Sequence, residues 1–337
     1  MTVYGQWIER WERTLTLKDS NRRILPFEWG TDWIGLDPMD GPQALNATLT
    51  WAKKAVEDSE TFYHTGPPSE VVLKGNELSF PTPTPSPILC NNTAYCRLFS
   101  ARNSTRAAIV IPQWNALRNS HVTLCKVLQT LGYTTLRLTL PYHEKRLPEG
   151  MVRADYMVSP NIGRTLHANR QAVLEVIQSV EWLKNEGFQT VAVVGTSIGS
   201  CIGYLAFVHE PRIDVGVFNH VSSYYADVVW TGLSTRYVRW GLEGFVRLDH
   251  LRQCWAPLSP WFFVDRLLHS WRPHLMITAR HDLSFLPKLS ELVFEKYRNL
   301  GIQFDHQVLP CGHYTTGVFP FKLLDGYLIC RYLRAPH

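Results

Sequence analysis

The chain has no strong excess of charge of either sign and no long polar tract. Over 337 residues it holds 34 Lys and Arg against 29 Asp and Glu, a formal net charge of +5, and the two signs are interleaved. A small, dispersed charge argues against a protein that binds nucleic acid. Because 45% of the residues are hydrophobic, global disorder is also excluded. We therefore expect a globular protein with no nucleic-acid partner.

Cysteines and histidines in metal-binding patterns are missing. The seven cysteines are odd in number and form no Cys-x-x-Cys pair, which argues against both a disulfide framework and a zinc ribbon. There is also no His-Glu-x-x-His motif and no Asp-rich calcium loop. We therefore expect free thiols, no metal and no cofactor.

Segments that target a chain to a membrane are also missing. No hydrophobic run approaches the ~20 residues that cross a bilayer. Residues 1–10 lack the basic start and apolar stretch of a secretory signal. We expect a cytoplasmic protein with no membrane span.

From residue 107 onward, short apolar runs alternate with segments of helical periodicity. The expected strands are 107–111, 134–140, 191–194, 215–218, 274–277 and 307–309, preceded by two shorter ones at 71–73 and 95–99. The expected helices are 124–131, 166–183, 287–299 and 320–334. Near-continuous apolar strands that alternate with helices are typical of a mostly parallel sheet covered on both faces. The pattern predicts an α/β fold.

Two regions do not follow this alternation. Residues 1–60 hold five of the twelve tryptophans, and some of their apolar residues fall at helical spacing, which predicts a helical arm over 1–69. Residues 224–270 mix tryptophans and phenylalanines with five arginines, and we interpret them as an inserted lid. Ordinary packing, a solvated face and a dimer interface are alternative interpretations of this segment.

The most specific motif directly follows the expected strand at 191–194. Gly195, Ser197 and Gly199 form a Gly-x-Ser-x-Gly sequence that opens a helix. The glycines permit a tight turn that lifts the serine above the sheet, and the helix N-terminus favours negative charge beside it. A chance match and a dinucleotide-binding loop are the alternatives, but the spacing does not give Gly-x-Gly-x-x-Gly. We expect Ser197 to be a nucleophile.

A serine nucleophile needs a base, and the base needs an acid to orient it. Asp282 and His313 follow the last two expected strands, so they reach the same edge of the sheet as Ser197. We predict these three residues to be catalytic. His220 and Asp227, which follow the preceding strand, are the alternative base and acid.

The order Ser197, Asp282, His313, together with Gly-x-Ser-x-Gly and the Gly-His pair at 312–313, resembles the α/β-hydrolase superfamily. The resemblance is nearest to its dienelactone-hydrolase-like and acetyl-esterase-like members and extends over residues 70–335. It implies the α/β-hydrolase fold, with a mostly parallel central sheet flanked by helices. It also implies that Ser197 is the nucleophile, Asp282 the acid and His313 the base.

The loop that supplies the second oxyanion-hole amide departs from that resemblance. Many relatives have His-Gly-x-Gly at this point, whereas residues 111–115 read Ile-Pro-Gln-Trp-Asn. We expect the N–H groups of Ile198 and Trp114 to form the oxyanion hole, with Gln113 as the alternative to Trp114. Three further candidates, for substrate binding, are His143, His121 and Trp230.

Together these residues predict a serine hydrolase that cleaves a carboxylic ester through an acyl-enzyme intermediate. The expected partner is a small-molecule ester, and the composition of residues 224–270 is also compatible with a homodimer. Thioesterase, peptidase or acyltransferase chemistry would use the same residues. From a different class, the alternative is a non-catalytic ligand-binding protein of the same fold, which would not need all three catalytic residues.

Overall fold

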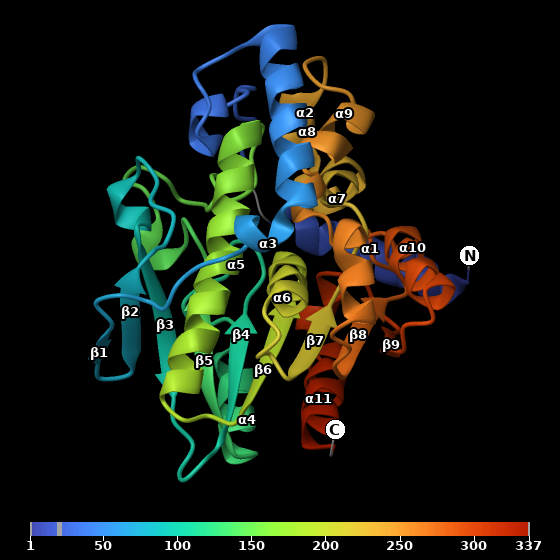
Figure 1. Ribbon diagram of the computed structural model, residues 1–337. Helices are drawn as coiled ribbons and strands as arrows, with labels where there is room; N and C mark the ends of the chain where they lie inside the picture. The colour runs from blue at the N-terminus through green and yellow to red at the C-terminus, as the bar shows by residue number, and fades with distance from the viewer. Residues whose placement is uncertain (1, 19–21, 336–337) are drawn as a thin grey trace.

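A computed structural model describes residues 2–18 and 22–335 of the chain (Figure 1). Its centre is a nine-stranded sheet in the order β1-β2-β3-β5-β4-β6-β7-β8-β9. The strands are β1 Val72–Lys74, β2 Glu77–Pro81, β3 Thr93–Phe99, β4 Arg106–Ile111, β5 Tyr133–Thr139, β6 Thr190–Thr196, β7 Val215–Asn219, β8 His274–Ala279 and β9 Asp305–Leu309. The pairs that join β1, β2, β3 and β5 are antiparallel, and those from β5 through β9 are parallel. The predicted mostly parallel sheet is confirmed.

Helices cover this sheet on both sides. The α-helices of the described chain are α1 Val3–Leu17, α2 Gly41–Glu57, α3 Ser59–Phe62, α4 Val122–Thr130, α5 Ile162–Asn185, α6 Ile198–His209, α7 Tyr225–Thr231, α8 Arg236–Leu242, α9 Leu248–Cys254, α10 Pro287–Asn299 and α11 Phe321–Arg334. Each helix from α4 to α6, and again α10, lies in the chain between two parallel strands, as a parallel connection requires.

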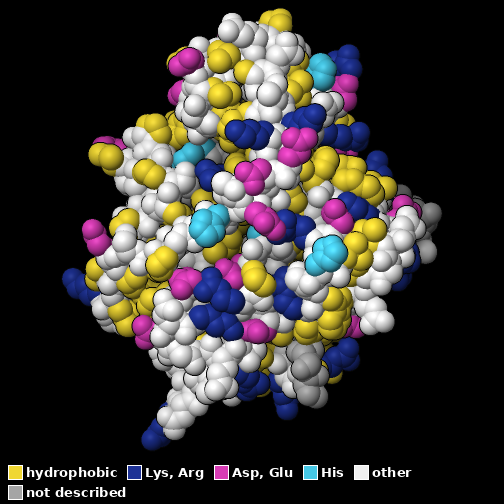
Figure 2. All heavy atoms as spheres, viewed as in Figure 1, with side chains coloured by type: hydrophobic (Ala, Val, Ile, Leu, Met, Phe, Trp, Pro, Cys, Tyr) yellow, Lys and Arg dark blue, Asp and Glu magenta, His cyan; other side chains and the backbone are white. Residues whose placement is uncertain are grey.

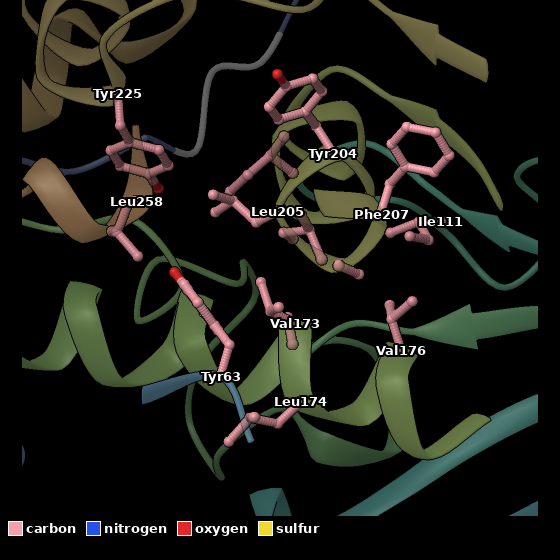
Figure 3. Packing of buried hydrophobic residues seen from close by; sticks show 14 of the residues in the cluster. Tyr63, Ile111, Val173, Leu174, Val176, Tyr204, Leu205, Phe207, Tyr225 and Leu258 are labelled. Atoms are coloured by element: carbon pink, nitrogen blue, oxygen red, sulfur yellow. The ribbon is translucent and has the colours of Figure 1, made fainter. Parts of the chain in front are cut away.

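Two separate hydrophobic cores lie on the two faces of the sheet. In β4, Ile109 and Ile111 belong to one core, whereas Ala108 and Val110 belong to the other, because successive side chains of a strand point to opposite faces. The first core includes side chains of α5, α6 and α10, and Figure 3 shows Val173 of α5 and Leu205 of α6 packed between these two helices. The second core includes side chains of α1, α4 and α11.

The two long N-terminal helices, α1 and α2, pack on different parts of the molecule. Ile8 of α1 belongs to the core on the α4 and α11 face. In contrast, α2 packs against α9 and the short 3-10 helix Ala256–Leu258, both within residues 224–270. Figure 1 shows α2, α8 and α9 together, beyond the carboxyl ends of β4 and β7. The two regions that break the α/β alternation therefore meet above the sheet edge where a catalytic site is expected.

Among residues 2–18 and 22–335, no helix is both long and apolar enough to cross a bilayer. On the face shown in Figure 2, basic and acidic side chains are interspersed with apolar ones rather than gathered by sign. This distribution agrees with the small net charge of the sequence.

Candidate active site

Ser197 lies at the sharp turn between β6 and α6. Its φ of 59° and ψ of −123° are an uncommon conformation for a residue with a side chain. The flanking glycines are required by space: a Cβ on Gly195 would lie 2.1 Å from the carbonyl oxygen of Gly199. A Cβ on Gly199 would lie 2.4 Å from the carbonyl oxygen of Ile111. The two glycines therefore allow the close approach that holds Ser197 in this turn.

The structure brings the three predicted catalytic residues into one chain of hydrogen bonds. Nε2 of His313 lies 2.9 Å from Oγ of Ser197, and Nδ1 lies 2.9 Å from Oδ2 of Asp282. The other carboxylate oxygen, Oδ1, accepts hydrogen bonds from the N–H groups of Ser284 and Phe285, each at 2.7 Å. With both of its oxygens engaged, Asp282 holds the imidazole so that Nε2 faces the serine.

The electrostatics of these groups suit proton transfer. Burial alone would raise the pKa of Asp282, but His313 and His220 hold it well below its usual range. Burial alone would lower the pKa of His313, but the carboxylates of Asp282 and Glu12 raise it. The ring of His313 is also stacked on Phe285, with centroids 5.0 Å apart. An ionised acid therefore lies beside an imidazole that can accept a proton.

The alternative base and acid make other contacts. His220 is buried, and its Nδ1 lies 2.9 Å from the same Oδ2 of Asp282. Asp227 instead forms a bidentate ion pair with Arg252, at 2.6 and 2.7 Å. Both histidines contact Asp282, but it is His313 whose other ring nitrogen lies 2.9 Å from the hydroxyl of Ser197, and this contact favours His313 as the base and Asp282 as the acid.

His220, Asp282 and His313 also have potential metal-ligand atoms within 4.8 Å of one another. Nδ1 of His313 and the carboxylate of Asp282 are already joined by the hydrogen bond that orients the imidazole. A metal ion bound here would replace that bond. The cluster therefore fits proton transfer better than metal binding.

The loop after β4 carries the candidate oxyanion-hole amides beside the start of α6. A Cβ on Gly199 would lie 2.6 Å from the carbonyl oxygen of Pro112, so this loop passes close to the serine turn. Among the residues that the structure describes, no partner is found for the N–H groups of Gln113, Trp114 or Ile198. These groups are available as hydrogen-bond donors, and the choice between Gln113 and Trp114 stays a prediction.

His143, a predicted substrate-binding residue, holds this loop in place. Its Nε2 accepts a hydrogen bond from the N–H of Asn115 at 2.8 Å, and its Nδ1 lies 2.8 Å from the carbonyl oxygen of Pro141. Burial lowers the pKa of His143 to about 4, which keeps Nε2 unprotonated as an acceptor. The indole N–H of Trp114 also donates to the carbonyl oxygen of Ala154, at 2.8 Å. His143 additionally lines a cavity of about 690 Å³.

The other two predicted substrate-binding residues contact the protein itself. Nε2 of His121 lies 3.0 Å from the hydroxyl of Thr196, and burial lowers the pKa of this histidine to about 4. Trp230 packs against the main core, with the guanidinium of Arg239 5.6 Å from its ring centroid. Their roles toward a substrate stay predictions.

Most of the arginines in residues 224–270 are paired with carboxylates. The pairs are Arg239 with Glu243, Arg247 with Asp249, Arg252 with Asp227, and Arg266 with Glu60. Paired surface arginines are typical of a solvated face. This is the alternative that the sequence left open for these residues.

Glu12 on α1 is a buried charge at the site that the sequence analysis missed. Its carboxylate accepts hydrogen bonds from the N–H of Tyr314 at 2.9 Å and from both the N–H and the hydroxyl of Thr315 at 2.6 Å. One signal was available, because Glu12 falls at helical spacing from Ile8 and Thr16, on the buried side of the helix. A glutamate on the buried side of a helix needs hydrogen-bond donors for its carboxylate.

Comparisons with known proteins agree with this fold. No family model and no curated protein matches the sequence. An acetyl xylan esterase from Paenibacillus sp. R4 is similar in structure, with a TM-score of 0.57 and 11% identity over 89% of this chain and 97% of that one. A putative dienelactone hydrolase from Klebsiella pneumoniae has a TM-score of 0.52 and 14% identity, over 73% and 93% of the two chains.

An acylaminoacyl peptidase from Pyrococcus horikoshii is also similar, with a TM-score of 0.54 and 11% identity over 72% of this chain. This chain spans only 39% of the length of that peptidase. The similarity therefore concerns one part of the larger protein. Together with the nine-stranded sheet and the serine turn, these likenesses show that the chain has the α/β-hydrolase fold.

Proposed function

We propose that this protein is a serine hydrolase that cleaves a carboxylic ester through an acyl-enzyme intermediate on Ser197. The proposal rests on the hydrogen-bonded chain from Ser197 through His313 to Asp282. A serine hydroxyl is a weak nucleophile until a base removes its proton. Here the base lies 2.9 Å from the hydroxyl and is oriented by a buried carboxylate.

In the proposed first half-reaction, Nε2 of His313 takes the proton of Ser197 as Oγ attacks the ester carbonyl carbon. The N–H of Ile198 and that of Trp114 or Gln113 then stabilise the tetrahedral oxyanion. The imidazolium gives its proton to the leaving alkoxide as the carbon–oxygen bond breaks. An alcohol is released and Ser197 is acylated.

In the second half-reaction, His313 removes a proton from water, which attacks the acyl carbon. The resulting imidazolium returns the proton to Oγ of Ser197 as the acyl bond breaks, so that a carboxylic acid is released. Asp282 stabilises the imidazolium in both halves without taking its proton.

We further propose that residues 224–270 act as a lid over this site and select the substrate. Two contacts with the acid loop support this role. The N–H of Leu233 donates to the carbonyl oxygen of Leu283 at 2.7 Å, next to Asp282. A Cβ on Gly232 would lie 2.7 Å from the carbonyl oxygen of Ser284, so the two segments pack closely.

A fluorophosphonate probe tests the enzyme class directly, because it phosphonylates an activated serine. We expect mass spectrometry to find one adduct on Ser197 in the wild-type protein and none in Ser197→Ala. Folded wild-type protein without an adduct would favour the non-catalytic ligand-binding alternative. Rates on an ester, a thioester and an anilide of the same acyl group would then separate the reaction types, and we expect the ester to react fastest.

A further inference from the structure

We infer that Glu12, on the N-terminal helix α1, is a positioning residue that holds the loop of His313 in its catalytic geometry. This inference rests on the proposed function, because that function makes His313 the base. It assigns the N-terminal segment, which lies outside the predicted catalytic domain of residues 70–335, a direct part in the machinery of the site.

The carboxylate of Glu12 fixes the backbone on both sides of His313. On one side, its two oxygens accept hydrogen bonds from the N–H groups of Tyr314 and Thr315, at 2.9 and 2.6 Å. On the other side, the N–H of Gly312 donates to the hydroxyl of Thr315 at 2.8 Å, and that hydroxyl donates to Glu12 at 2.6 Å. The N–H groups of Tyr314 and Thr315 therefore bond to the carboxylate of Glu12 directly. The N–H of Gly312 is linked to the same carboxylate through the hydroxyl of Thr315.

The close packing around Glu12 restricts its carboxylate to one position. Glu12 has an exposed fraction of 0%, and a Cβ on Gly312 would lie 2.4 Å from its side-chain carbons. The glycine of the Gly-His pair thus makes room for Glu12. Because a buried charge without donors is strongly destabilising, these hydrogen bonds tie the position of α1 to that of the loop.

The rest of α1 contacts both loops that carry the acid and the base. The hydroxyl of Tyr4 donates to the carbonyl oxygen of Pro310, at the end of β9. A Cβ on Gly5 would lie 2.8 Å from the ring of His281, the residue before Asp282. A displacement of α1 would therefore move the acid and the base relative to Ser197.

Glu12 also acts on His313 through its charge. The titratable groups around His313 are Asp282 after β8, His220 after β7, Glu12 on α1, and Cys311 and Tyr314 on its own loop, with Arg22 donating to the Tyr314 hydroxyl. The charge of Glu12 adds to that of Asp282 in raising the pKa of His313. Loss of this charge should lower that pKa, so the acid limb of the pH–rate profile should move to lower pH.

The test is Glu12→Gln, which keeps the side-chain volume but removes the charge and two-oxygen acceptor. We expect kcat on a p-nitrophenyl ester to fall by about 10- to 100-fold with little change in KM, because small misplacements of catalytic groups lower the rate of the chemical step. We also expect the acid limb to move to lower pH. Thr16→Val is the matched control, because Thr16 is equally buried on α1 but its hydroxyl donates to the backbone carbonyl of Glu12 and, within the described part of the chain, to no other group. This variant should keep the wild-type kcat and pH profile.

Wild-type kcat and an unmoved acid limb in folded Glu12→Gln would overturn the inference. If that variant does not fold, Thr315→Val decides, since it removes the bridging hydroxyl but keeps the charge. It should lower kcat by about tenfold and leave the acid limb in place, and an unchanged kcat would overturn the inference. Labelling of wild-type Ser197 by the fluorophosphonate separates the two proposals. If wild-type Ser197 is labelled and the variants keep their kcat, only the positioning role of Glu12 is refuted. If wild-type Ser197 is not labelled, both proposals fail.

Discussion

The ring nitrogens of His313 lie 2.9 Å from the hydroxyl of Ser197 and 2.9 Å from the carboxylate of Asp282, although the three residues are far apart in the sequence. Each follows a different parallel strand, and the carboxyl ends of parallel strands meet at one edge of the sheet. The proposed reaction depends on this meeting of three strand ends at one edge of the sheet. It also depends on Asp282 remaining ionised while His313 gains and loses a proton.

We predict that Asp282→Asn lowers kcat by about 10⁴, because the amide cannot stabilise the imidazolium or hold its tautomer. The measurement is steady-state hydrolysis of a p-nitrophenyl ester. Asp227→Asn is the control, since its carboxylate pairs with Arg252 within residues 224–270, and it should change kcat far less. If the two effects were reversed, the acid would be Asp227 and the assignment of Asp282 would be wrong.

The pH dependence of kcat/KM should follow His313. Because the base must be neutral to accept a proton, activity should rise as pH rises through its pKa and be lost below it. The carboxylates of Asp282 and Glu12 raise that pKa, so the midpoint of the acid limb should lie above the ordinary histidine value of about 6.5. A midpoint clearly below this value would contradict the assigned electrostatics.

Catalytic residues could be predicted from the sequence where a local motif or the end of a strand points to them, and their role stays a prediction. Ser197, Asp282 and His313 are of this kind. Glu12 was missed because its partners lie some 300 residues away along the chain, and no local pattern couples them. The substrate-binding role of His143 stays a prediction, and its Nε2 accepts a hydrogen bond from the N–H of Asn115, a contact that only the fold brings into reach.

At the scale of the elements, the turn from β6 to α6 has little space for added atoms. We predict that Gly199→Ala lowers the free energy of unfolding by about 1–3 kcal/mol, because the added methyl would meet the backbone carbonyl of Ile111 at 2.4 Å. Urea denaturation measures this change. Gly326→Ala on α11 is the control, since no atom lies within 4 Å of its added Cβ, and it should be neutral or stabilising. Equal stability of the two variants would contradict the packing described here.

Helices and strands with strong hydrophobic periodicity were predicted well. The strand expected at 107–111 is β4, Arg106–Ile111, and the helix expected at 320–334 is α11, Phe321–Arg334. In contrast, β2 was not anticipated, because it alternates Leu78 and Phe80 with polar residues and ends at a proline. Such a short strand is identified only by its pairing with β1 and β3.

In the whole molecule, α2 and residues 224–270 pack together above the sheet, which joins the two regions that the sequence placed outside the α/β pattern. Hydrophobic periodicity describes single helices and cannot show that segments some 200 residues apart pack on each other. The predicted boundaries of arm and lid therefore stay predictions.

The tryptophans of residues 224–270 should differ in their effect on this assembly. Trp255 is fully buried, and its indole N–H donates to the carbonyl oxygen of Ile162 at 3.2 Å, whereas Trp240 is 47% exposed. We predict that Trp255→Ala lowers the free energy of unfolding by about 3–5 kcal/mol and that Trp240→Ala changes it little. Thermal and urea denaturation measure both, and a larger effect of Trp240→Ala would contradict this packing. Sedimentation of Trp240→Ala would also test the homodimer interface that the sequence left open for this segment.

The acyl-enzyme on Ser197 is the step on which the proposed function depends, and rapid-mixing kinetics measure it. A p-nitrophenyl ester is mixed with a high concentration of enzyme. The first acylation of each enzyme molecule then releases p-nitrophenol rapidly, and slower deacylation limits the later turnovers. We predict a burst equal to the concentration of active sites, an acyl adduct on Ser197 in the intact mass spectrum, and neither in Ser197→Ala. A burst of the same size in Ser197→Ala, or an adduct on another residue, would contradict the assignment of the nucleophile.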